Sequence, residues 1–309
     1  MQQVLEIVNQ VRKVVVGKDA VIGSILMAML AQGHVLLEDV PGVGKTTMAL
    51  AFSRAMDLSY KRMQFTPDVM PSDITGYTTI QIGGSAGAYV PGAAMCNLFL
   101  ADEINRASSK TQSALLEVME ENSITVDGVT RAVPQPFLVI ATQNPAGSSG
   151  TQPLPESQLD RFMVRLSMGY PDRRSEVEML RRHQNSVSLD NVSRVVSPQD
   201  LALMQREVES VFVSEALFSY ITELASWTRA QPAIRFGVSP RGTIALLRMS
   251  KASAYLSGRD YLIPQDVQGV FESVCAHRLL LSPRAMVSGI TEQQLAKRAL
   301  TQVQPPVVV

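Results

Sequence analysis

Cysteine, histidine and aromatic residues are scarce in this sequence, and neither sign of charge is in excess. The two cysteines, Cys96 and Cys275, lie far apart without CxxC spacing, so buried, reduced thiols are expected rather than a disulfide or a zinc site. The three histidines show no ligand spacing either. Lys and Arg number 28, as do Asp and Glu, so no global positive field attracts the chain to nucleic acid.

Long apolar runs are also absent. At the amino terminus, Glu6, Arg12 and Lys13 interrupt the apolar residues, so this segment lacks the continuous core of a signal peptide. The apolar stretch at 21–31 is too short to span a bilayer and reads as a buried helix. We therefore expect a cytoplasmic protein that makes no membrane contact.

The length and the change of pattern along the chain predict two domains, because 309 residues exceed the usual size of one hydrophobic core. A polar, Ser-rich stretch at 185–200 separates a mixed pattern from a helical one. We predict an α/β domain at 1–190 and an all-helical domain at 191–309. Four prolines of the second domain have the spacing of helix boundaries: Pro198, Pro240, Pro264 and Pro283.

Short apolar runs in the first domain alternate with helical or looped segments, a pattern typical of parallel strands joined by crossovers. These runs lie at 34–37, 63–65, 97–101, 137–141 and 163–168. The predicted fold is therefore a five-stranded parallel sheet between helices.

Two insertions interrupt this alternation. Residues 77–90 surround a Gly-rich segment at 83–87, and residues 124–133 surround Gly128. Both insertions are predicted to be β-hairpins. Since they add no core, we expect them to face a partner or a pore.

The clearest motif lies between the first predicted strand and a helix predicted at 45–56. Residues 39–46 read DVPGVGKT, which fits GxxxxGK[ST] except that Asp39 stands in place of the first glycine. Gly42 and Gly44 allow backbone N–H groups to face phosphate oxygens at a helix start, where the dipole also favours an anion. The simpler alternative is a Gly-rich turn with an exposed lysine.

The polar residues of this loop have distinct expected roles. Lys45 would reach the β- and γ-phosphates of a nucleotide, and the Thr46 hydroxyl would ligate Mg²⁺. Thr47 is placed to touch the α-phosphate. The expected ligands are therefore ATP and Mg²⁺.

Two adjacent acids follow the apolar strand at 97–101. Asp102 is expected to hold the Mg²⁺ shell, and Glu103 to orient and deprotonate the attacking water. An acid pair at a strand end can also be only a solvated terminus. Together with the phosphate loop, the pair favours a nucleotide-hydrolysing site.

The segments EDVPGVGKTT, LFLADEINRA, KTQSALLEVMEE, VIATQNP, LPESQLDRF and VSPRG occur in this order. The chain thereby resembles the MoxR family of AAA+ ATPases over about 16–241. The resemblance implies a P-loop AAA+ core with two hairpin insertions and an all-α lid. Asp39 departs from the family pattern, and so does PGAAM at 91–95, where a further proline is expected.

The resemblance also implies roles for single residues. Asn144 looks like the sensor that positions water against the γ-phosphate, Arg161 like the arginine finger, and Arg241 like the sensor arginine of the lid. A planar guanidinium suits charge spread over phosphoryl oxygens. Without the family, either arginine reads as a surface ion-pair residue. The residues expected to bind the nucleotide are Val16 and Gly17 (adenine pocket), Pro41, Gly42, Val43, Gly44, Lys45, Thr46 and Thr47.

By resemblance, ATP should lie between sheet and lid, in a homo-oligomeric ring that is expected to be a hexamer. Such a ring would remodel or activate partner proteins in a chaperone-like way, often partners with a von Willebrand factor A-type domain. Two other functions stay open: an ATP-dependent motor on nucleic acid, and a nucleotide-gated scaffold. Zero net charge counts against the first, and the presence of Glu103, Asn144 and Arg161 together counts against the second.

Overall fold

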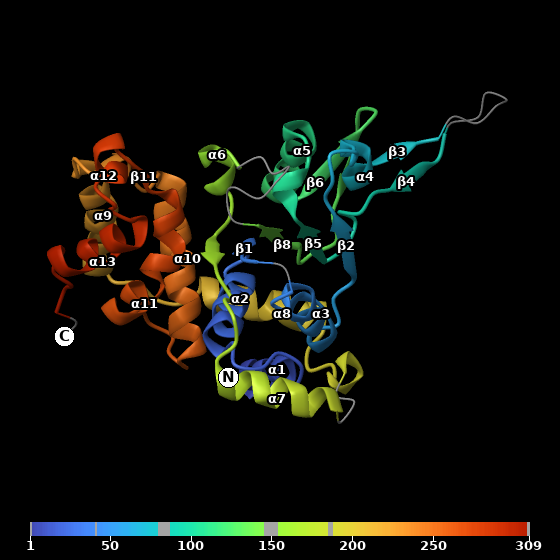
Figure 1. Ribbon diagram of the computed structural model, residues 1–309, viewed down its shortest axis with the longest axis horizontal. Helices are drawn as coiled ribbons and strands as arrows, with labels where there is room; N and C mark the ends of the chain where they lie inside the picture. The colour runs from blue at the N-terminus through green and yellow to red at the C-terminus, as the bar shows by residue number, and fades with distance from the viewer. Residues whose placement is uncertain (1, 41, 80–86, 145–153, 185–187, 308–309) are drawn as a thin grey trace.

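The computed structural model describes residues 2–40, 42–79, 87–144, 154–184 and 188–307. These residues form an α/β core and a helical lid that lie beside one another, and one hairpin projects from the side of the core remote from the lid (Figure 1). Over the described ranges, no helix combines the length and the apolar character needed to cross a membrane.

Five parallel strands form the central sheet, as predicted, in the order β2-β5-β8-β1-β9. The strands are β1 (Val35–Glu38), β2 (Tyr60–Gln64), β5 (Leu98–Asp102), β8 (Leu138–Gln143) and β9 (Val164–Leu166). Because every neighbouring pair is parallel, the carboxyl ends of the strands meet at one edge of the sheet. The segments that follow β1, β5 and β8 therefore come together there.

Helices cover both faces of the sheet. Alternation along β5 shows the two faces: Leu98 and Leu100 pack into the apolar cluster that contains α1, α2 and α3, while Phe99 and Ala101 pack into the one that contains α4 and α5. The helical segments of residues 1–190 are α1 (Gln2–Arg12), α2 (Asp19–Leu30), α3 (Lys45–Ala55), α4 (Pro71–Thr75), η1 (Ile104–Arg106), α5 (Ser109–Glu121), α6 (Glu156–Leu159) and α7 (Arg173–Gln184), with η2 at Leu189–Asn191.

Both predicted hairpins are present as antiparallel strand pairs. The pairs are β3 (Gly76–Thr78) with β4 (Tyr89–Pro91), and β6 (Ser123–Val126) with β7 (Val129–Ala132). Asp127 and Gly128 join β6 to β7 with φ of 51° and 75°, as a two-residue hairpin turn requires. The Gly-rich tip of the first hairpin lies mostly outside the described residues.

The lid is helical as predicted, with one departure. Its helices are α8 (Pro198–Glu209), α9 (Glu215–Ala230), α10 (Pro240–Leu256), α11 (Pro264–Cys275), η3 (Ala276–Arg278), α12 (Pro283–Val287) and α13 (Glu292–Gln302). All four prolines open helices, where a missing N–H costs nothing. The departure is a short antiparallel ribbon of β10 (Ile234–Phe236) and β11 (Leu280–Leu281), which all-helical periodicity does not anticipate.

Core and lid share one apolar cluster, which runs from Val4 to Val303. Helix α8 packs against both α2 and α10, and the Gln205 side chain on α8 donates to the Met29 carbonyl at 2.8 Å. The boundary at residue 190 stays a prediction. Cys96 and Cys275 are buried thiols, and burial raises their pKa values to about 11 and about 12.

Candidate functional site

The phosphate loop has the backbone that its glycines predict. Gly42 and Gly44 have φ of 84° and 93°, a region that residues with a Cβ rarely adopt, and Gly44 caps the start of α3. A Cβ on Gly42 would meet no heavy atom within 4 Å, so the loop borders open space where a phosphate could approach. Val43 is half-buried against the apolar cluster and anchors the loop, and Pro41 lies outside the described residues.

Lys45 is the first residue of α3 and is buried. Its ammonium donates to the Asp39 carbonyl at 2.8 Å, which holds the side chain across the mouth of the loop. Burial lowers the pKa of Lys45, whereas the carboxylates of Asp102, Asp39 and Glu103 oppose that shift. A desolvated cation beside a helix start is suited to binding an anion.

Asp39 explains the departure from the first glycine of the motif. Its Oδ2 accepts from the Ser167 hydroxyl at 3.0 Å, from the Met168 N–H, and from the Gly169 N–H at 2.8 Å. The carboxylate therefore ties the phosphate loop to the segment that follows β9. A glycine could not make these contacts.

Asp102 ends β5 and is held at both oxygens. The Thr142 hydroxyl donates to Oδ1 at 2.6 Å, and Arg62 on β2 reaches Oδ2 at 2.8 Å. Such fixed carboxylate oxygens are ligands that Mg²⁺ prefers.

Glu103 follows with φ of 56°, a left-handed conformation uncommon for a residue with a side chain. Its N–H donates to the Thr142 hydroxyl at 2.9 Å. Its Oε2 accepts from Gln64 at 2.8 Å and from Arg106 at 3.0 Å, and its Oε1 accepts from the Asn144 amide at 3.0 Å. The backbone turn thus separates the two acids, so that Asp102 and Glu103 face different partners.

Asn144 follows β8 and closes this edge of the site. Its carbonyl accepts from Asn105 at 3.2 Å, and its side-chain Oδ1 is buried with no hydrogen-bond partner among the described residues. A buried acceptor without a partner is costly unless another group, such as water or a ligand, satisfies it. An amide with a free acceptor beside Glu103 suits the positioning of a water molecule.

These residues line one cavity of about 420 Å³ at the carboxyl edge of the sheet. Predicted residues in its wall are Gly42, Gly44, Lys45, Thr46, Thr47, Asp102, Glu103 and Asn144. Arg62 and Gln64 also line it and were missed: the predicted strand began at 63, so Arg62 fell outside it, and nothing in the sequence singled out Gln64. No described residue of the lid lines this cavity, and the position of ATP between sheet and lid stays a prediction.

Val16 and Gly17 do not line this cavity. They lie in the turn before α2, where a Cβ on Gly17 would come within 2.0 Å of the Ser175 hydroxyl oxygen. Lys18 next to them donates to the Met168 and Gly169 carbonyls at 2.5 and 3.0 Å. This turn therefore borders the phosphate loop through the segment that Asp39 also binds.

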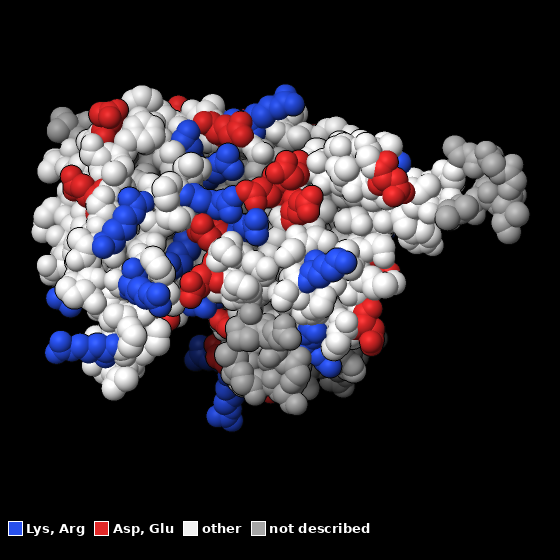
Figure 2. Space-filling view, turned by 90° about the horizontal axis from the view of Figure 1, so that it is seen from above, with Lys and Arg blue, Asp and Glu red and all other residues white. Residues whose placement is uncertain are grey.

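Arg161 and Arg241 lie elsewhere, at a second cavity of about 410 Å³ where core and lid meet. Both pair with Glu120 at the end of α5: Arg161 through Nε at 2.9 Å, and Arg241 through a terminal nitrogen. Glu120 was not anticipated, and both arginines favour its charged form and lower its pKa. Figure 2 shows basic and acidic side chains gathered along this junction, between the lid at left and the core at right.

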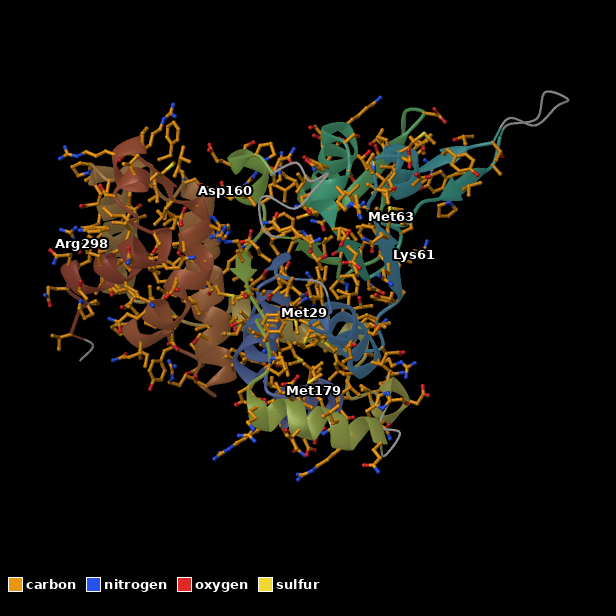
Figure 3. All side chains as sticks on the ribbon, in the orientation of Figure 1. Met29, Lys61, Met63, Asp160, Met179 and Arg298 are labelled. Carbon is orange, nitrogen blue, oxygen red and sulfur yellow. The ribbon has the colours of Figure 1, made fainter. Side chains whose placement is uncertain are left out.

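Asp160, labelled in Figure 3 at the same junction, ties the lid to the core. Its Oδ1 accepts from Arg278 and its Oδ2 from the Ser239 hydroxyl, both at 2.8 Å. The LDRF and SPRG segments, 79 residues apart at Asp160 and Ser239, are thus in direct contact.

Comparison with known proteins agrees with the fold and with the phosphate-loop cavity. The ATPase family associated with various cellular activities (AAA) matches residues 34–164, and the AAA lid domain matches residues 227–299. A crystal structure from Cytophaga hutchinsonii, assigned as an ATPase, superposes with a TM-score of 0.91 at 37% identity, covering 99% of this chain and 96% of its own. The chain is an ATPase of the AAA+ class.

Two curated relatives define the family more closely. The uncharacterised protein YeaC of Bacillus subtilis is 45% identical over 97% of this chain and 94% of its own length. The chaperone MoxR1 of Mycobacterium tuberculosis is 38% identical over 97% of this chain and 81% of its own length. The chain belongs to the MoxR family of AAA+ ATPases, as the sequence motifs predict.

Proposed function

We propose that this ATPase works as a homo-oligomeric ring, a hexamer in the cytoplasm, which uses ATP hydrolysis to remodel or activate partner proteins. The relative named as a chaperone supports this role, and the absence of net charge disfavours a nucleic-acid partner. A protein with a von Willebrand factor A-type domain is the proposed partner.

The phosphate-loop cavity suits Mg²⁺ and ATP. Lys45 and the N–H groups at the start of α3 would bind phosphate oxygens, and Thr46 and Asp102 would hold the metal ion. Bound Mg²⁺ supplies positive charge that neutralises phosphate oxygens. Glu103 would take the proton of the attacking water, and Asn144 would orient that water through its free acceptor.

One observation carries the proposal of a ring: the two candidate catalytic arginines are not at the phosphate loop of their own chain. Among the described residues, the arginine in the wall of that cavity is Arg62, and it is paired with Asp102. Arg161 and Arg241 occupy the second cavity instead. A site that needs these arginines would be complete only where a second subunit supplies them.

Mixing of two inactive variants tests this shared site. Lys45→Ala removes a phosphate-binding group, and Arg161→Ala removes the arginine finger, whose loss should cost roughly 10³- to 10⁵-fold in turnover. Each variant alone should be nearly inactive. Mixed subunits should recover activity, because some interfaces then pair an intact phosphate loop with an intact arginine.

Phosphate release from separate and mixed variants is the measurement, with subunit exchange followed by fluorescence transfer between labelled chains. Arg235→Ala, a lid arginine outside both cavities, serves as the matched control and should keep wild-type turnover. Exchange without any recovery would rule out the shared site.

A further inference from the structure

Glu120 joins the two candidate catalytic arginines to a single carboxylate. It lies in the last turn of α5, and its oxygens take one arginine each: Oε2 binds Arg161 of the core, and Oε1 binds Arg241 of the lid. A carboxylate with two guanidinium partners leaves a net charge of one positive unit. The group of three therefore still attracts an anion.

The mode of binding leaves donors available on Arg161. A guanidinium has five N–H donors in a fixed fork, and Glu120 engages Arg161 through Nε. Among the described residues, the two terminal nitrogens of Arg161 have no hydrogen-bond partner. Glu120 thus orients the guanidinium group through Nε. The two terminal nitrogens stay available, and these can donate two hydrogen bonds to a phosphate.

Two other charged side chains in the wall of this cavity, Arg278 and Asp160, already have partners. Arg278 is almost fully buried and donates to Asp160 and to backbone carbonyls, including that of Phe162 at 2.7 Å. Asp160 in turn is bound by Arg278 and Ser239. Glu120 is therefore the carboxylate that sets the positions of Arg161 and Arg241.

We infer that Glu120 is a positioning residue: it holds Arg161 and Arg241 side by side, so that both meet one phosphoryl group of ATP bound to the neighbouring subunit. This inference rests on the shared site proposed above. Positioning matters because displacement of a reacting group by about 1 Å can cost roughly 10²-fold in rate. The same carboxylate links the core arginine to the lid arginine, so the two engage together.

The direct test replaces Glu120 in the full-length chain. Glu120→Gln should lower kcat about 10- to 10²-fold, because the neutral amide accepts from only one arginine and turns an NH₂ group toward the other. The KM for ATP and the affinity for a fluorescent ADP analogue should change less than about twofold, since Lys45 and the phosphate loop are untouched. Glu121→Gln, an exposed acid one residue further, is the matched control and should keep wild-type kcat.

Mixing distinguishes a positioning role from a general structural one. Glu120→Gln mixed with Lys45→Ala should regain activity, because Lys45→Ala subunits still present correctly held arginines. Glu120→Gln mixed with Arg161→Ala should not, because both lack arginine function. If Glu120→Gln does not fold, Glu120→Asp, which keeps the charge on a shorter chain, replaces it throughout and should lower kcat by a smaller factor.

Wild-type or faster turnover in a folded Glu120 variant would overturn the inference. Recovery of ATPase activity when the Glu120 variant is mixed with Arg161→Ala would overturn it as well. Failure of the proposed function itself has a different result: Lys45→Ala and Arg161→Ala would then fail to complement each other, whatever Glu120 does.

Discussion

Glu103 has a strained backbone conformation, and hydrogen bonds hold both its backbone N–H and its carboxylate. Its left-handed φ costs about 1 kcal/mol or more, and Gln64, Arg106 and Asn144 fix the carboxylate that the turn presents. Strain of this kind persists where the surrounding structure imposes it, and it is frequent at active sites. The geometry supports Glu103 as the group that acts on water.

We expect Glu103→Gln to bind ATP normally and to lose roughly 10²- to 10⁴-fold in turnover, the usual cost of removing a general base. Lys45→Ala should instead weaken ATP binding, because Lys45 contacts phosphate in the ground state. Equilibrium binding and phosphate release separate the two effects. Glu117→Gln, on the exposed side of α5, is the control, and near-normal turnover in Glu103→Gln would remove the glutamate from this role.

His34 is a buried histidine whose tautomer the structure defines. The Val139 N–H donates to Nδ1 at 3.1 Å, so the proton is on Nε2, which donates to the Met119 carbonyl at 3.1 Å. Burial lowers the pKa of His34 to about 4 from an ordinary 6.5. The folded state therefore keeps His34 neutral at a pH where the unfolded chain binds a proton.

The contribution of His34 to stability should fall as the pH is lowered from 6.5 toward 4, because the unfolded state alone gains the proton in that window. Between pH 7 and pH 5 the loss amounts to about 2 kcal/mol. Urea unfolding at both values measures it. His34→Gln should be less stable at pH 7 but lose about 2 kcal/mol less on acidification, whereas exposed His183→Gln should keep the wild-type difference. An unchanged difference in His34→Gln would contradict this origin.

Among the elements, the two hairpins form one connected structure beside the sheet. The Arg131 guanidinium on β7 lies 4.0 Å above the centre of the Tyr89 ring on β4, and the Tyr89 hydroxyl donates to the Thr75 carbonyl at 2.6 Å. Such a cation–π contact contributes about 0.5–1 kcal/mol at an exposed site. The hairpin β3–β4 thereby projects in a fixed direction while exposing Tyr77 and Val90 (Figure 1).

Exposed apolar groups on a projecting hairpin suit contact with a partner protein. We expect Tyr77→Ser to keep basal ATPase activity and thermal stability while reducing suppression of heat-induced aggregation of citrate synthase severalfold. Phe212→Ser, a lid variant of similar exposure, should retain both activities. Equal losses in the two variants would show that the hairpin has no special part in binding.

The individual strands, the hairpins and the phosphate loop could be predicted because each is marked by residues close in sequence, whereas the order β2-β5-β8-β1-β9 joins strands far apart in the chain. Alternation and turn glycines define a hairpin locally, and GxxxxGK[ST] defines a loop within eight residues. Arg62 was missed because the predicted strand began at residue 63, three residues after β2 begins at Tyr60. The pairing of Glu120 with Arg161 and Arg241 spans 41 and 121 residues, and no local pattern encodes such a contact. The sequence marked Asp39 only as a departure from the phosphate-loop motif, because the donors to its carboxylate, at Ser167, Met168 and Gly169, lie 128 to 130 residues further along the chain.

At the scale of the whole molecule, the apolar cluster from Val4 to Val303 has a consequence for how the protein resists heat. Because α8 packs against both α2 and α10, unfolding of the lid exposes apolar surface of the core, and unfolding of the core exposes apolar surface of the lid. A nucleotide bound at the edge of the sheet therefore stabilises α13 in the lid against unfolding, as well as the core. Nucleotide binding is therefore expected to raise the unfolding temperature of the lid together with that of the core.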